Sequence, residues 1–505
     1  MEKRVRVRFA PSPTGGLHMG GVRTALFNYL FAKKHGGDFI LRIEDTDQTR
    51  FVEGAEEYII NALKWCGIEP NEGVGFGDGK HKPYRQSERK ELGIYKKYAD
   101  KLIASGHAYY AFDTSEELDE MRKRLEAAKV VAPQYNVVTR QNMRNSLTLS
   151  AEEVQKELSE GKPYVVRLKV PRNEEIRFND IIRGWVVVNS AQVDDKVLLK
   201  SDGMPTYHLA HIVDDIEMEI SHVVRGEEWL PSAPAHILIY RYLGLEESMP
   251  KLAHLPLILN PDGNGKISKR ESRFPVFPLS WKDPREAEPF IGYKEAGYFP
   301  EAFVNILALL GWNPGDNQEI FSVEEISKIF EFERVHKSGA KFDPEKAKWF
   351  NQQYLKNKTN AELAALFKPT LIEKGYNLDE IFVQEYCRLV KEKAQFVHEF
   401  WQHGYFILEA PTSYDEKVMT KKWNADVKVL FIKLLDKLKT VSKWDAHELH
   451  EVFNAAALEL GKLDMQVMRV LVTGVAGGPQ LFDVMALIGK EKVLERLDEA
   501  FKKLS

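Results

Sequence analysis

The loop between residues 11 and 21 has the composition of a phosphate-binding turn. It reads PSPTGGLHMGG and holds the glycines Gly15, Gly16, Gly20 and Gly21. Helical spacing of apolar residues begins at Val22, so the loop leads into a helix N-terminus, where free N–H groups and the helix dipole favour phosphate. The glycines permit close approach of a ligand, and His18 can donate a hydrogen bond to a phosphate oxygen. The loop matches neither the Walker A nor the GxGxxG motif, and an ordinary turn into a helix is the alternative interpretation.

A second segment, residues 260–273, concentrates positive charge directly after two glycines. It reads NPDGNGKISKRESR, and its cations are Lys266, Lys269, Arg270 and Arg273. Cations in loops of this kind close over a polyphosphate and stabilise the charge on a departing group. Taken by itself, the segment is also compatible with a solvated basic loop.

The elements that must position the first loop form a βαβ unit. Residues 4–9 alternate arginine with apolar side chains, which predicts a strand with Val5, Val7 and Phe9 on one face. A helix should follow from Val22 and stop near residues 33–37, and residues 39–43 should form a second strand. Such a unit predicts a parallel sheet whose ligands bind at the carboxyl ends of the strands.

The pattern changes twice along the rest of the chain. Charge-rich helical stretches at 116–129 and 151–160 precede strand-like runs at 164–170 and 185–189. An α/β pattern resumes at 197, with a strand at 222–226 and a helix at 233–243, so an α/β domain split by an insertion is the simplest account. Beyond about residue 320 helical periodicity dominates. The helices expected there cover residues 324–332, 343–353, 361–374, 427–438, 446–460 and 491–503.

Composition narrows the class of protein. The chain has 505 residues, of which 44% are hydrophobic, and its 71 basic and 75 acidic residues nearly cancel. These values exclude a disordered chain and a wholly basic nucleic-acid coat, but not a local basic face. Two cysteines, Cys66 and Cys387, are too few for a structural zinc set and fit a reducing compartment. Because no stretch approaches about 18 apolar residues and no signal segment is evident, we expect a cytoplasmic, multidomain protein without membrane attachment.

Two motifs together resemble a known family. Residues 11–21 and the KISKR run at 266–270 are similar to the two signature motifs of class I aminoacyl-tRNA synthetases. The runs RFAPSPTG (8–15), LRIEDTD (41–47), SDGMPTYHLA (201–210) and VRGEEWL (224–230) resemble the glutamyl and glutaminyl branch. The resemblance covers nearly the whole chain. The PQLFDVMAL run (479–487) is similar to the helical end of the bacterial glutamyl members, whereas glutaminyl members end in β-barrels.

The resemblance implies a fold and a division into domains. We expect a Rossmann-like parallel-sheet catalytic domain split by an α+β insertion, followed by an all-helical anticodon-binding region. The expected segments are the two catalytic halves (1–110 and 191–255), an acceptor-stem-binding insertion (111–190), a stem-contact region with the KISKR loop (256–330) and two helical anticodon-binding subdomains (331–410 and 411–505).

The resemblance also implies an activity. This is the ATP-dependent activation of L-glutamate to glutamyl-adenylate, followed by transfer to the terminal adenosine of tRNA(Glu). Mg²⁺ is expected with ATP, and no zinc is expected, because residues 109–113, where some bacterial relatives carry cysteines, read YYAFD. The expected state is a monomer. The alternatives are a form that also charges tRNA(Gln), and a non-catalytic RNA-binding protein on the same frame.

The resemblance assigns roles to individual residues. Glutamate would be bound by Arg8, Ser12, Glu44, Tyr207 and Arg225, with Arg8 on its side-chain carboxylate and Glu44 on its amino group. ATP would be bound by Thr14, Gly16, His18, Gly20, Gly21 and Lys269. The expected catalytic residues are His18, Lys266, Ser268 and Lys269, of which Lys266 and Lys269 would close on the leaving pyrophosphate. His211 stands where many relatives have asparagine, and Trp229 is either a site residue or a core residue.

Residues 421–444 are the clearest candidate for a local RNA-binding face. They contain seven lysines and two acids, with Trp423, Phe431 and Trp444 among them. A phosphate-facing helix and a solvated amphipathic face are both compatible with this pattern.

Overall fold

The computed structural model describes residues 4–268, 273–461 and 463–504. The chain divides into two compact units. Unit 1 comprises Met1–Ala296 and Pro300–Pro344, and unit 2 comprises Gly297–Phe299 and Glu345–Ser505. Each unit is described by itself.

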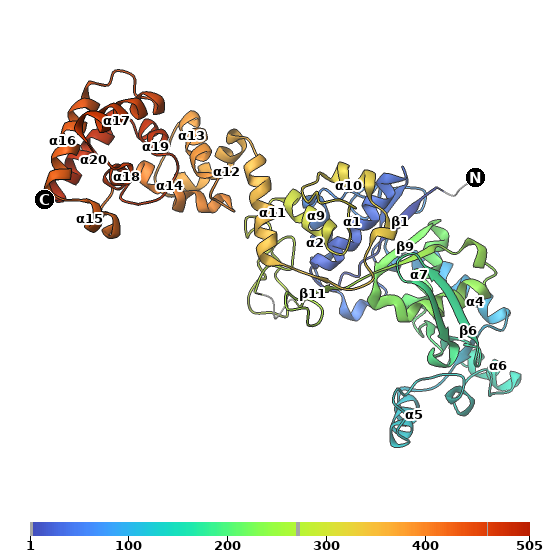
Figure 1. Ribbon diagram of the computed structural model, residues 1–505. Helices are drawn as coiled ribbons and strands as arrows, with labels where there is room; N and C mark the ends of the chain where they lie inside the picture. Colours follow the sequence, from blue (N-terminus) through green and yellow to red (C-terminus); the bar gives the residue numbers. More distant parts are fainter. Residues whose placement is uncertain (1–3, 269–272, 462, 505) are drawn as a thin grey trace. The chain divides into compact units, whose positions relative to one another are not determined.

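The first parallel sheet of unit 1 is built on the predicted βαβ unit. Strand β1 (Arg6–Phe9) pairs in parallel with β2 (Asp38–Leu41), and β2 pairs in parallel with β3 (Glu72–Gly73). Helix α1 (Met19–Lys34) makes the crossover and packs against β1 and β2 (Figure 1). The prediction of a strand, a helix and a parallel strand in the first 45 residues is therefore confirmed.

A second sheet adjoins the first and completes the Rossmann-like core. Strand β9 (His222–Gly226) lies beside β1 and pairs in parallel with β10 (Lys251–Leu255). Strand β10 pairs in parallel with β6 (Glu175–Asp180), and β7 (Gly184–Asn189) closes the edge in the antiparallel direction. The catalytic fold class expected from the resemblance is confirmed, and β6 and β7, although they lie in segment 111–190, belong to this sheet.

A third, small sheet joins the insertion to both catalytic halves. Strands β4 (Ala108–Ala111), β5 (Val165–Leu168) and β8 (Val197–Leu199) pair in antiparallel order, and only β5 lies wholly within the expected bounds 111–190. The helices of the insertion, α5 (Ser115–Ala127) and α6 (Ala151–Ser159), both begin with a capping box, in which Thr114 pairs with Glu117 and Ser150 with Glu153. These caps place both helix starts within a residue of the predicted ones.

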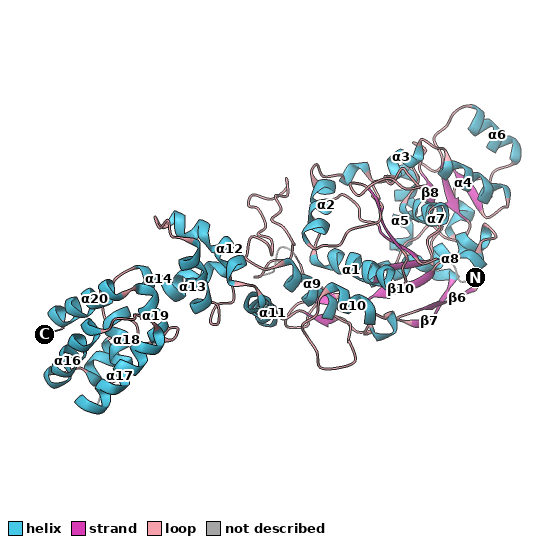
Figure 2. Cartoon of the chain, turned by 90° about the horizontal axis from the view of Figure 1, so that it is seen from above, coloured by secondary structure: helices cyan, strands magenta, loops and turns pink. Residues whose placement is uncertain are grey.

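The remaining elements of unit 1 surround the sheets. Figure 2 shows α1 between the sheet region and the helices α9 and α10, against which it packs. The other α-helices and strands are α2 (Ala55–Trp65), α3 (Gln86–Lys90), α4 (Ile94–Ala104), α7 (Tyr207–Glu217), α8 (Ala233–Tyr242), α9 (Pro300–Leu309), α10 (Val323–Ile329), β11 (Ile258–Leu259) and β12 (Ala340–Lys341). The 3₁₀ helices are Gln48–Arg50, Thr139–Asn142, Ser190–Gln192, Glu227–Ser232, Glu246–Ser248, Phe332–Arg334 and, in unit 2, Val397–Glu399.

The described part of unit 2 is helical, as predicted. Its helices are α11 (Pro344–Asn357, which begins at the last residue of unit 1), α12 (Asn360–Glu373), α13 (Glu380–Val390), α14 (Phe400–Leu408), α15 (Glu416–Lys422), α16 (Ala425–Thr440), α17 (Ala446–Leu460), α18 (Met465–Thr473), α19 (Leu481–Ile488) and α20 (Lys490–Lys503). The predicted helical ranges do not include α13, α14, α15 or α18. For α14 the reason is that residues 400–408 are mostly apolar and show no polar stripe with a helical period.

The aromatic residues between 421 and 444 pack into unit 2. Phe431 is buried, Trp423 Nε1 donates to the carbonyl of Leu504 at 3.1 Å, and Trp444 Nε1 donates to that of Met485 at 3.0 Å. Several lysines of the stretch pair with carboxylates, for example Lys437 with Glu459 at 2.6 Å. The aromatic side chains of this stretch therefore pack within unit 2, and a phosphate-facing role for its lysines stays a prediction.

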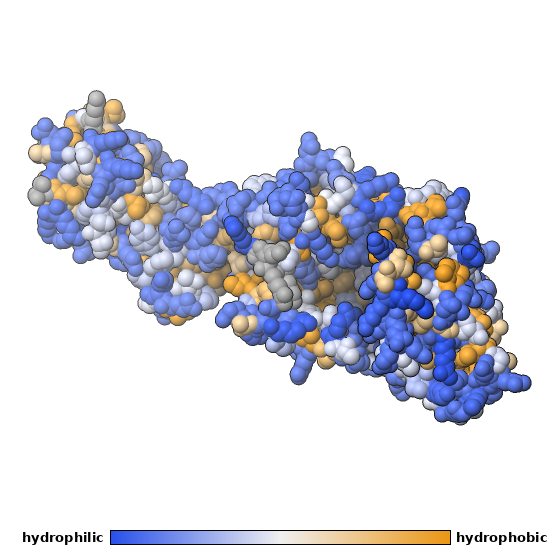
Figure 3. Space-filling view, turned by 90° about the horizontal axis from the view of Figure 1, so that it is seen from below, coloured by the Kyte–Doolittle hydropathy of each residue, from blue (hydrophilic) through white to orange (hydrophobic). Residues whose placement is uncertain are grey.

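The surface of the chain is mainly polar. Figure 3 shows hydrophobic residues on one face as small patches within a hydrophilic surface. Within the described ranges, no helix combines the length and the apolar character needed to cross a bilayer.

Candidate active site

A cavity of about 590 Å³ opens at the carboxyl ends of β1 and β9. Its walls come from the loop after β1, the start of α1, the residues after β2, the first turns of α7, and the segment after β9. The predicted site residues that line it are Arg8, Ser12, Thr14, His18, Gly20, Gly21, Glu44, Tyr207, Arg225 and Lys266. The structure thus brings together residues from both halves of the split domain, at the edge of the sheet where ligands were expected.

The other predicted site residues do not line this cavity in the described structure. Gly16 lies behind it, because a Cβ added there would come within 2.7 Å of Trp281 Cγ. Ser268 is described but is not part of the cavity wall, and Lys269 lies outside the described residues. Trp229 is 42% exposed and lines the cavity with its ring 4.5 Å from that of Tyr207, so it is not a core residue.

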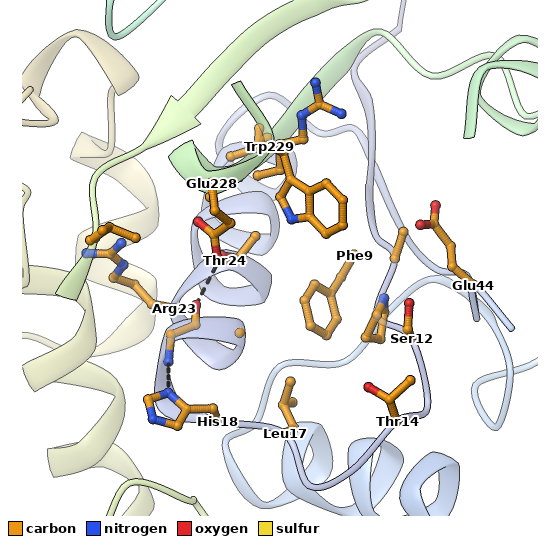
Figure 4. A pocket seen from close by; sticks show the side chains of 18 of the residues that line it. Phe9, Ser12, Thr14, Leu17, His18, Arg23, Thr24, Glu44, Glu228 and Trp229 are labelled. Carbon is orange, nitrogen blue, oxygen red and sulfur yellow. Dashed lines mark hydrogen bonds between the residues drawn. The ribbon is translucent and has the colours of Figure 1, made fainter. Parts of the chain in front are cut away.

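The two ends of the cavity differ in chemistry. Figure 4 shows His18 at the start of α1 on one side and Glu44 on the other, with the rings of Phe9 and Trp229 between them in this view. The side of His18 offers the N-terminus of a helix, whereas the side of Glu44 is rich in buried charge. The first suits an anion such as phosphate, and the second suits a small ligand with charges of both signs.

Arg8 is held by a carboxylate from a distant part of the chain. Its Nε donates to Asp215 Oδ1 at 3.0 Å and its Nη2 to Oδ2 at 3.3 Å, with both residues buried. Burial by itself raises the pKa of Asp215, but Arg8, His211 and Arg42 outweigh it, so the pKa lies well below its usual range. Among the described residues, none accepts a hydrogen bond from Nη1 of Arg8, so this group is available for a ligand carboxylate.

Glu44 is an ionised carboxylate at the same end. Arg42, which is fully buried, donates from Nη2 to Glu44 Oε1 at 2.9 Å and from Nη1 to Asp215 Oδ1 at 2.8 Å. Burial raises the pKa of Glu44, but His211 and Arg42 lower it by more, and the pKa falls below its ordinary value. An ionised Glu44 is suited to bind an ammonium group.

His211 lies between the two arginines of the pocket. Its Nδ1 is 3.4 Å from Arg8 Nη2 and its Nε2 is 3.3 Å from Arg225 Nη1. Burial is the largest influence and lowers the pKa of His211 to about 4, so the ring is neutral at physiological pH. Arg8 and Arg225 are therefore separated by a neutral ring and not by a third cation.

The sequence analysis missed the carboxylates and imidazoles behind the pocket. Asp215 was not predicted, although it follows His211 by four residues and thus shares its helix face. His254 contacts Arg225, and Asp180 contacts His254. Both lie on other strands than Arg225, and no sequence motif around them indicates this role. Arg42 was not predicted either, although it lies two residues before the predicted Glu44, and this spacing places both side chains on one face of an extended strand.

The buried histidines make stability depend on pH. Burial lowers the pKa of His208, His211 and His222 to about 4, whereas an unfolded histidine titrates near its ordinary value of 6.5. Between these values the unfolded chain binds more protons, so the free energy of unfolding falls as the pH is lowered from 6.5 towards 4, by about 1.4 kcal/mol per pH unit for each such histidine. We expect His211→Gln to remove one such contribution when urea unfolding is measured between pH 5 and 7.

A matched control is His336→Gln, which replaces an exposed histidine of the same unit. Its unfolding free energy should show the wild-type dependence on pH. If His211→Gln also keeps the wild-type slope, His211 is not the neutral buried group described here.

The phosphate side is formed by the first turn of α1. His18 caps the helix, and its Nδ1 accepts the N–H of Gly20 at 3.2 Å, which places the ring proton on Nε2. Lys266 Nζ pairs with Glu228 Oε1 at 3.0 Å across the rim of the cavity. A donor ring, a helix N-terminus and a lysine thus lie around one part of the cavity.

The positions of Gly16 and Gly20 require a small residue for different reasons, so we expect alanine to have different effects at the two positions. Gly16→Ala places a methyl group against Trp281 and should lower the free energy of unfolding by about 1–3 kcal/mol. Gly20→Ala meets no described atom closer than His18 Nδ1 at 3.7 Å, so stability should be unchanged or slightly higher. Its methyl group enters the cavity, however, and should raise the KM for ATP, the ligand that the resemblance implies, about tenfold or more.

Urea unfolding and initial-rate kinetics separate these two effects. A stable Gly20→Ala variant with an unchanged KM for this expected ligand would contradict phosphate binding at this turn. An undisturbed stability of Gly16→Ala would contradict its packing role.

Comparisons with known proteins identify the family of the chain. Residues 4–349 match the family model described as tRNA synthetases class I (E and Q), catalytic domain, and residues 362–501 match an anticodon binding domain. The chain is 55% identical to a glutamate–tRNA ligase of Cytophaga hutchinsonii over 100% of this chain and 98% of that protein. It is 51% identical to one from Amoebophilus asiaticus over 99% of each.

Solved structures are similar over the same extent. A crystal structure of a glutamate tRNA ligase from Elizabethkingia meningosepticum, in complex with its amino acid, has a TM-score of 0.93 and 47% identity, with 100% of both chains covered. A glutamate–tRNA synthetase from Elizabethkingia anophelis has a TM-score of 0.92 and 48% identity, with 99% of this chain and 100% of that chain covered.

Proposed function

Because the chain belongs to the class I tRNA synthetases of the glutamate and glutamine group, we propose that the cavity at the ends of β1 and β9 is where L-glutamate is activated with ATP. The chain is an enzyme, a ligase that joins glutamate to tRNA. The observation that carries the assignment of the cavity is its charge pattern: Arg8 and Arg225 flank a neutral His211, with the ionised Glu44 beside them.

This pattern is complementary to the three charges of glutamate. Arg8 binds the side-chain carboxylate through its available N–H groups, and Ser12 and Tyr207 add hydrogen bonds. Glu44 binds the α-ammonium group, and Arg225 contributes positive charge to the carboxylates. The α-carboxylate is then directed toward the half of the cavity that contains His18.

ATP occupies the half formed by the start of α1. Thr14, Gly20, Gly21 and the donor ring of His18 contact its phosphates, with Gly16 supporting the turn from behind. Lys266 releases Glu228 and closes on the leaving pyrophosphate together with Ser268 and Lys269 of the KISKR run. Lys269 and its role rest on the sequence motif.

The first step requires positioning more than acid–base chemistry. An oxygen of the glutamate α-carboxylate attacks the α-phosphorus of ATP, and the bond from that phosphorus to the bridging oxygen of pyrophosphate breaks. The carboxylate is already ionised, so no side chain needs to accept a proton. The chain's own residues hold the two reactants in line and neutralise the charge that develops on the leaving group.

The second step transfers the glutamyl group to tRNA. A ribose hydroxyl of the terminal adenosine attacks the carbonyl carbon of the adenylate, and AMP leaves with its phosphate oxygen. By the class I resemblance this is the 2′-hydroxyl. Unit 2 contributes the anticodon-binding surface, which its match to an anticodon binding domain supports.

Mg²⁺ is the metal that we propose for the reaction, and we propose no zinc. Among the described residues, His, Cys, Asp and Glu side chains form no group of three that suits a metal. Mg²⁺ is held mainly by substrate phosphates and water and so arrives with ATP. When bound, Mg²⁺ supplies charge neutralisation on the phosphates. We further propose a cytoplasmic monomer that charges tRNA(Glu).

Aminoacylation with radiolabelled glutamate, ATP and Mg²⁺ tests this function, with separate tRNA(Glu) and tRNA(Gln) transcripts. We expect glutamate on tRNA(Glu). Charging of both transcripts would instead identify a relaxed enzyme whose tRNA(Gln) product needs later amidation. If the folded protein charges neither transcript, the proposed function is wrong.

A further inference from the structure

We infer that Asp180 and His254 are positioning residues that hold the guanidinium of Arg225 for the amino acid substrate. The two residues do not line the cavity but form a hydrogen-bonded chain that ends on Arg225. The inference rests on the proposed role of Arg225 in glutamate binding and adds the part of the protein that aims this side chain.

The chain of contacts runs across three neighbouring strands. Asp180 ends β6, His254 lies in β10, and Arg225 lies in β9, where it is the register partner of His254. His254 Nδ1 is 2.6 Å from Asp180 Oδ2, and Arg225 Nε donates to His254 Nε2 at 3.0 Å. Asp180 is 1% exposed and His254 is fully buried, so water does not compete for these hydrogen bonds.

The carboxylate of Asp180 sets the tautomer of His254. Its Oδ1 accepts the backbone N–H groups of Ile182 at 3.0 Å and Arg183 at 2.8 Å, and its Oδ2 accepts that of His254 at 3.1 Å. Burial raises the pKa of Asp180, but these N–H groups and the His254 ring lower it by more. An ionised carboxylate only accepts hydrogen bonds, so Nδ1 of His254 must carry the proton.

The lone pair of His254 then faces Arg225. Burial lowers the pKa of His254, so the ring is neutral and its Nε2 is an acceptor. Arg225 Nε always carries a proton and meets a partner of the right kind. If the proton of His254 were on Nε2, two N–H groups would point at each other across 3.0 Å, and this contact would be lost.

This contact decides where Arg225 points. Tyr207 Oη at 2.8 Å, His211 Nε2 at 3.3 Å and His236 Nδ1 at 3.4 Å all lie around its Nη1. His254 is the described residue that pairs with Nε, and none pairs with Nη2, although Arg225 lines the cavity. Because hydrogen bonds hold Nε on His254 and Nη1 on Tyr207, the guanidinium presents Nη2 to the ligand in one orientation.

Asp180→Asn tests this chain with almost no change in shape. The side-chain oxygen keeps the N–H groups of Ile182 and Arg183, so the amide NH₂ takes the place of Oδ2 and donates to Nδ1 of His254. The backbone N–H of His254 loses Oδ2 as its acceptor and keeps the remaining oxygen, which lies 3.4 Å away. The ring proton moves to Nε2 and opposes Arg225. We expect the KM for glutamate to rise about 10- to 100-fold, the usual size for loss of a supporting hydrogen bond, while the KM for ATP changes less than about threefold.

A second buried carboxylate provides the matched control. Asp195 is fully buried and binds Tyr109, Arg140 and the N–H of Val170 within the same unit, but it does not contact the pocket arginines. Asp195→Asn should leave both KM values unchanged, whatever it does to the melting temperature. If Asp180→Asn raises the KM for glutamate and the KM for ATP equally, Asp180 only stabilises the fold, and the inference is wrong. It is also wrong if neither KM rises.

The coupling between Asp180 and His254 gives an independent readout. His254→Gln removes the ring through which Asp180 acts, so adding Asp180→Asn to it should change the KM for glutamate by less than about twofold. If the fold-changes that the two substitutions cause in the KM for glutamate multiply in the double variant, Asp180 does not act through His254, and the inference is wrong.

Arg225→Ala separates this inference from the proposed function. If Arg225→Ala raises the KM for glutamate but Asp180→Asn keeps the wild-type KM, the positioning role of Asp180 and His254 is wrong, whereas the role of Arg225 stands. An unchanged KM in Arg225→Ala overturns the role of Arg225 itself, and the positioning chain with it.

Discussion

Replacing Arg8 by alanine should raise the KM for glutamate about 1,000-fold, which corresponds to about 4 kcal/mol, while the KM for ATP stays within about threefold. Arg8 is 3% exposed and its position is set by two hydrogen bonds to Asp215, so it binds a ligand carboxylate without ordering a free side chain. Alanine removes the guanidinium and also leaves Asp215 with Arg42 as its remaining arginine partner. The negative charge of Asp215 is then less neutralised, and it repels the carboxylate of the ligand. Initial rates of aminoacylation at varied glutamate and varied ATP measure both constants.

Two further variants define what Arg8 contributes. Arg8→Lys keeps the charge but loses the fork that binds Asp215 and a carboxylate together, and should recover only part of the affinity. Arg4→Ala is the control, because Arg4 also pairs with an aspartate, Asp38, but has an exposed side chain. Equal changes in the two KM values for Arg8→Ala would contradict the carboxylate assignment.

Ending the chain after Pro344 should lower the affinity for tRNA(Glu) at least about 100-fold and reduce the dependence of binding on salt. This variant lacks the helices of unit 2, including residues 362–501, which match an anticodon binding domain. Loss of phosphate contacts lowers the number of counterions released on binding, which is why the salt dependence should flatten. Filter binding at several salt concentrations gives both quantities.

The folded state of the shortened protein must be checked in the same preparation. Phe299 normally donates its N–H to Asn351, which the shortened chain lacks, so some loss of stability near residues 297–299 is expected. Stabilisation by glutamate with ATP in a thermal melt shows that the pocket of unit 1 is intact. Wild-type tRNA affinity in such a protein would contradict the proposed role of unit 2.

The sequence predicts local features of this fold well because their causes are local. The glycines and His18 at the start of α1, and the alternation in β1, follow from helix capping and strand periodicity. What the alternation does not predict is that both faces of β1 are buried. The arginine face is buried because Arg6 pairs with Asp38 and Glu72 and Arg8 with Asp215, and these partners are set by the tertiary fold.

The same distinction between local causes and tertiary partners applies to the residues of the candidate site. Residues within motifs, such as Arg8, Glu44, Tyr207 and Arg225, could be predicted, and the structure places them around one cavity. Asp215, His254 and Asp180 could not, because each acts through a partner on another strand or helix. Short motifs carry the groups that contact a ligand, whereas the groups that orient them are scattered through the chain.

The hydrogen bond between Arg8 and Asp215 joins residues 207 positions apart, and the cavity wall continues to Ile267. A nascent chain therefore has no complete pocket until more than half of it has left the ribosome. Contacts of such sequence separation require closure of a long loop before they stabilise anything, and they form late in folding. Arg4, just before the first strand, and Arg6 find their partners early, in Asp38 and Glu72, whereas Arg8 stays without its carboxylate until Asp215 has been made. In the meantime the face of the strand that Asp215 later covers is exposed to wrong contacts.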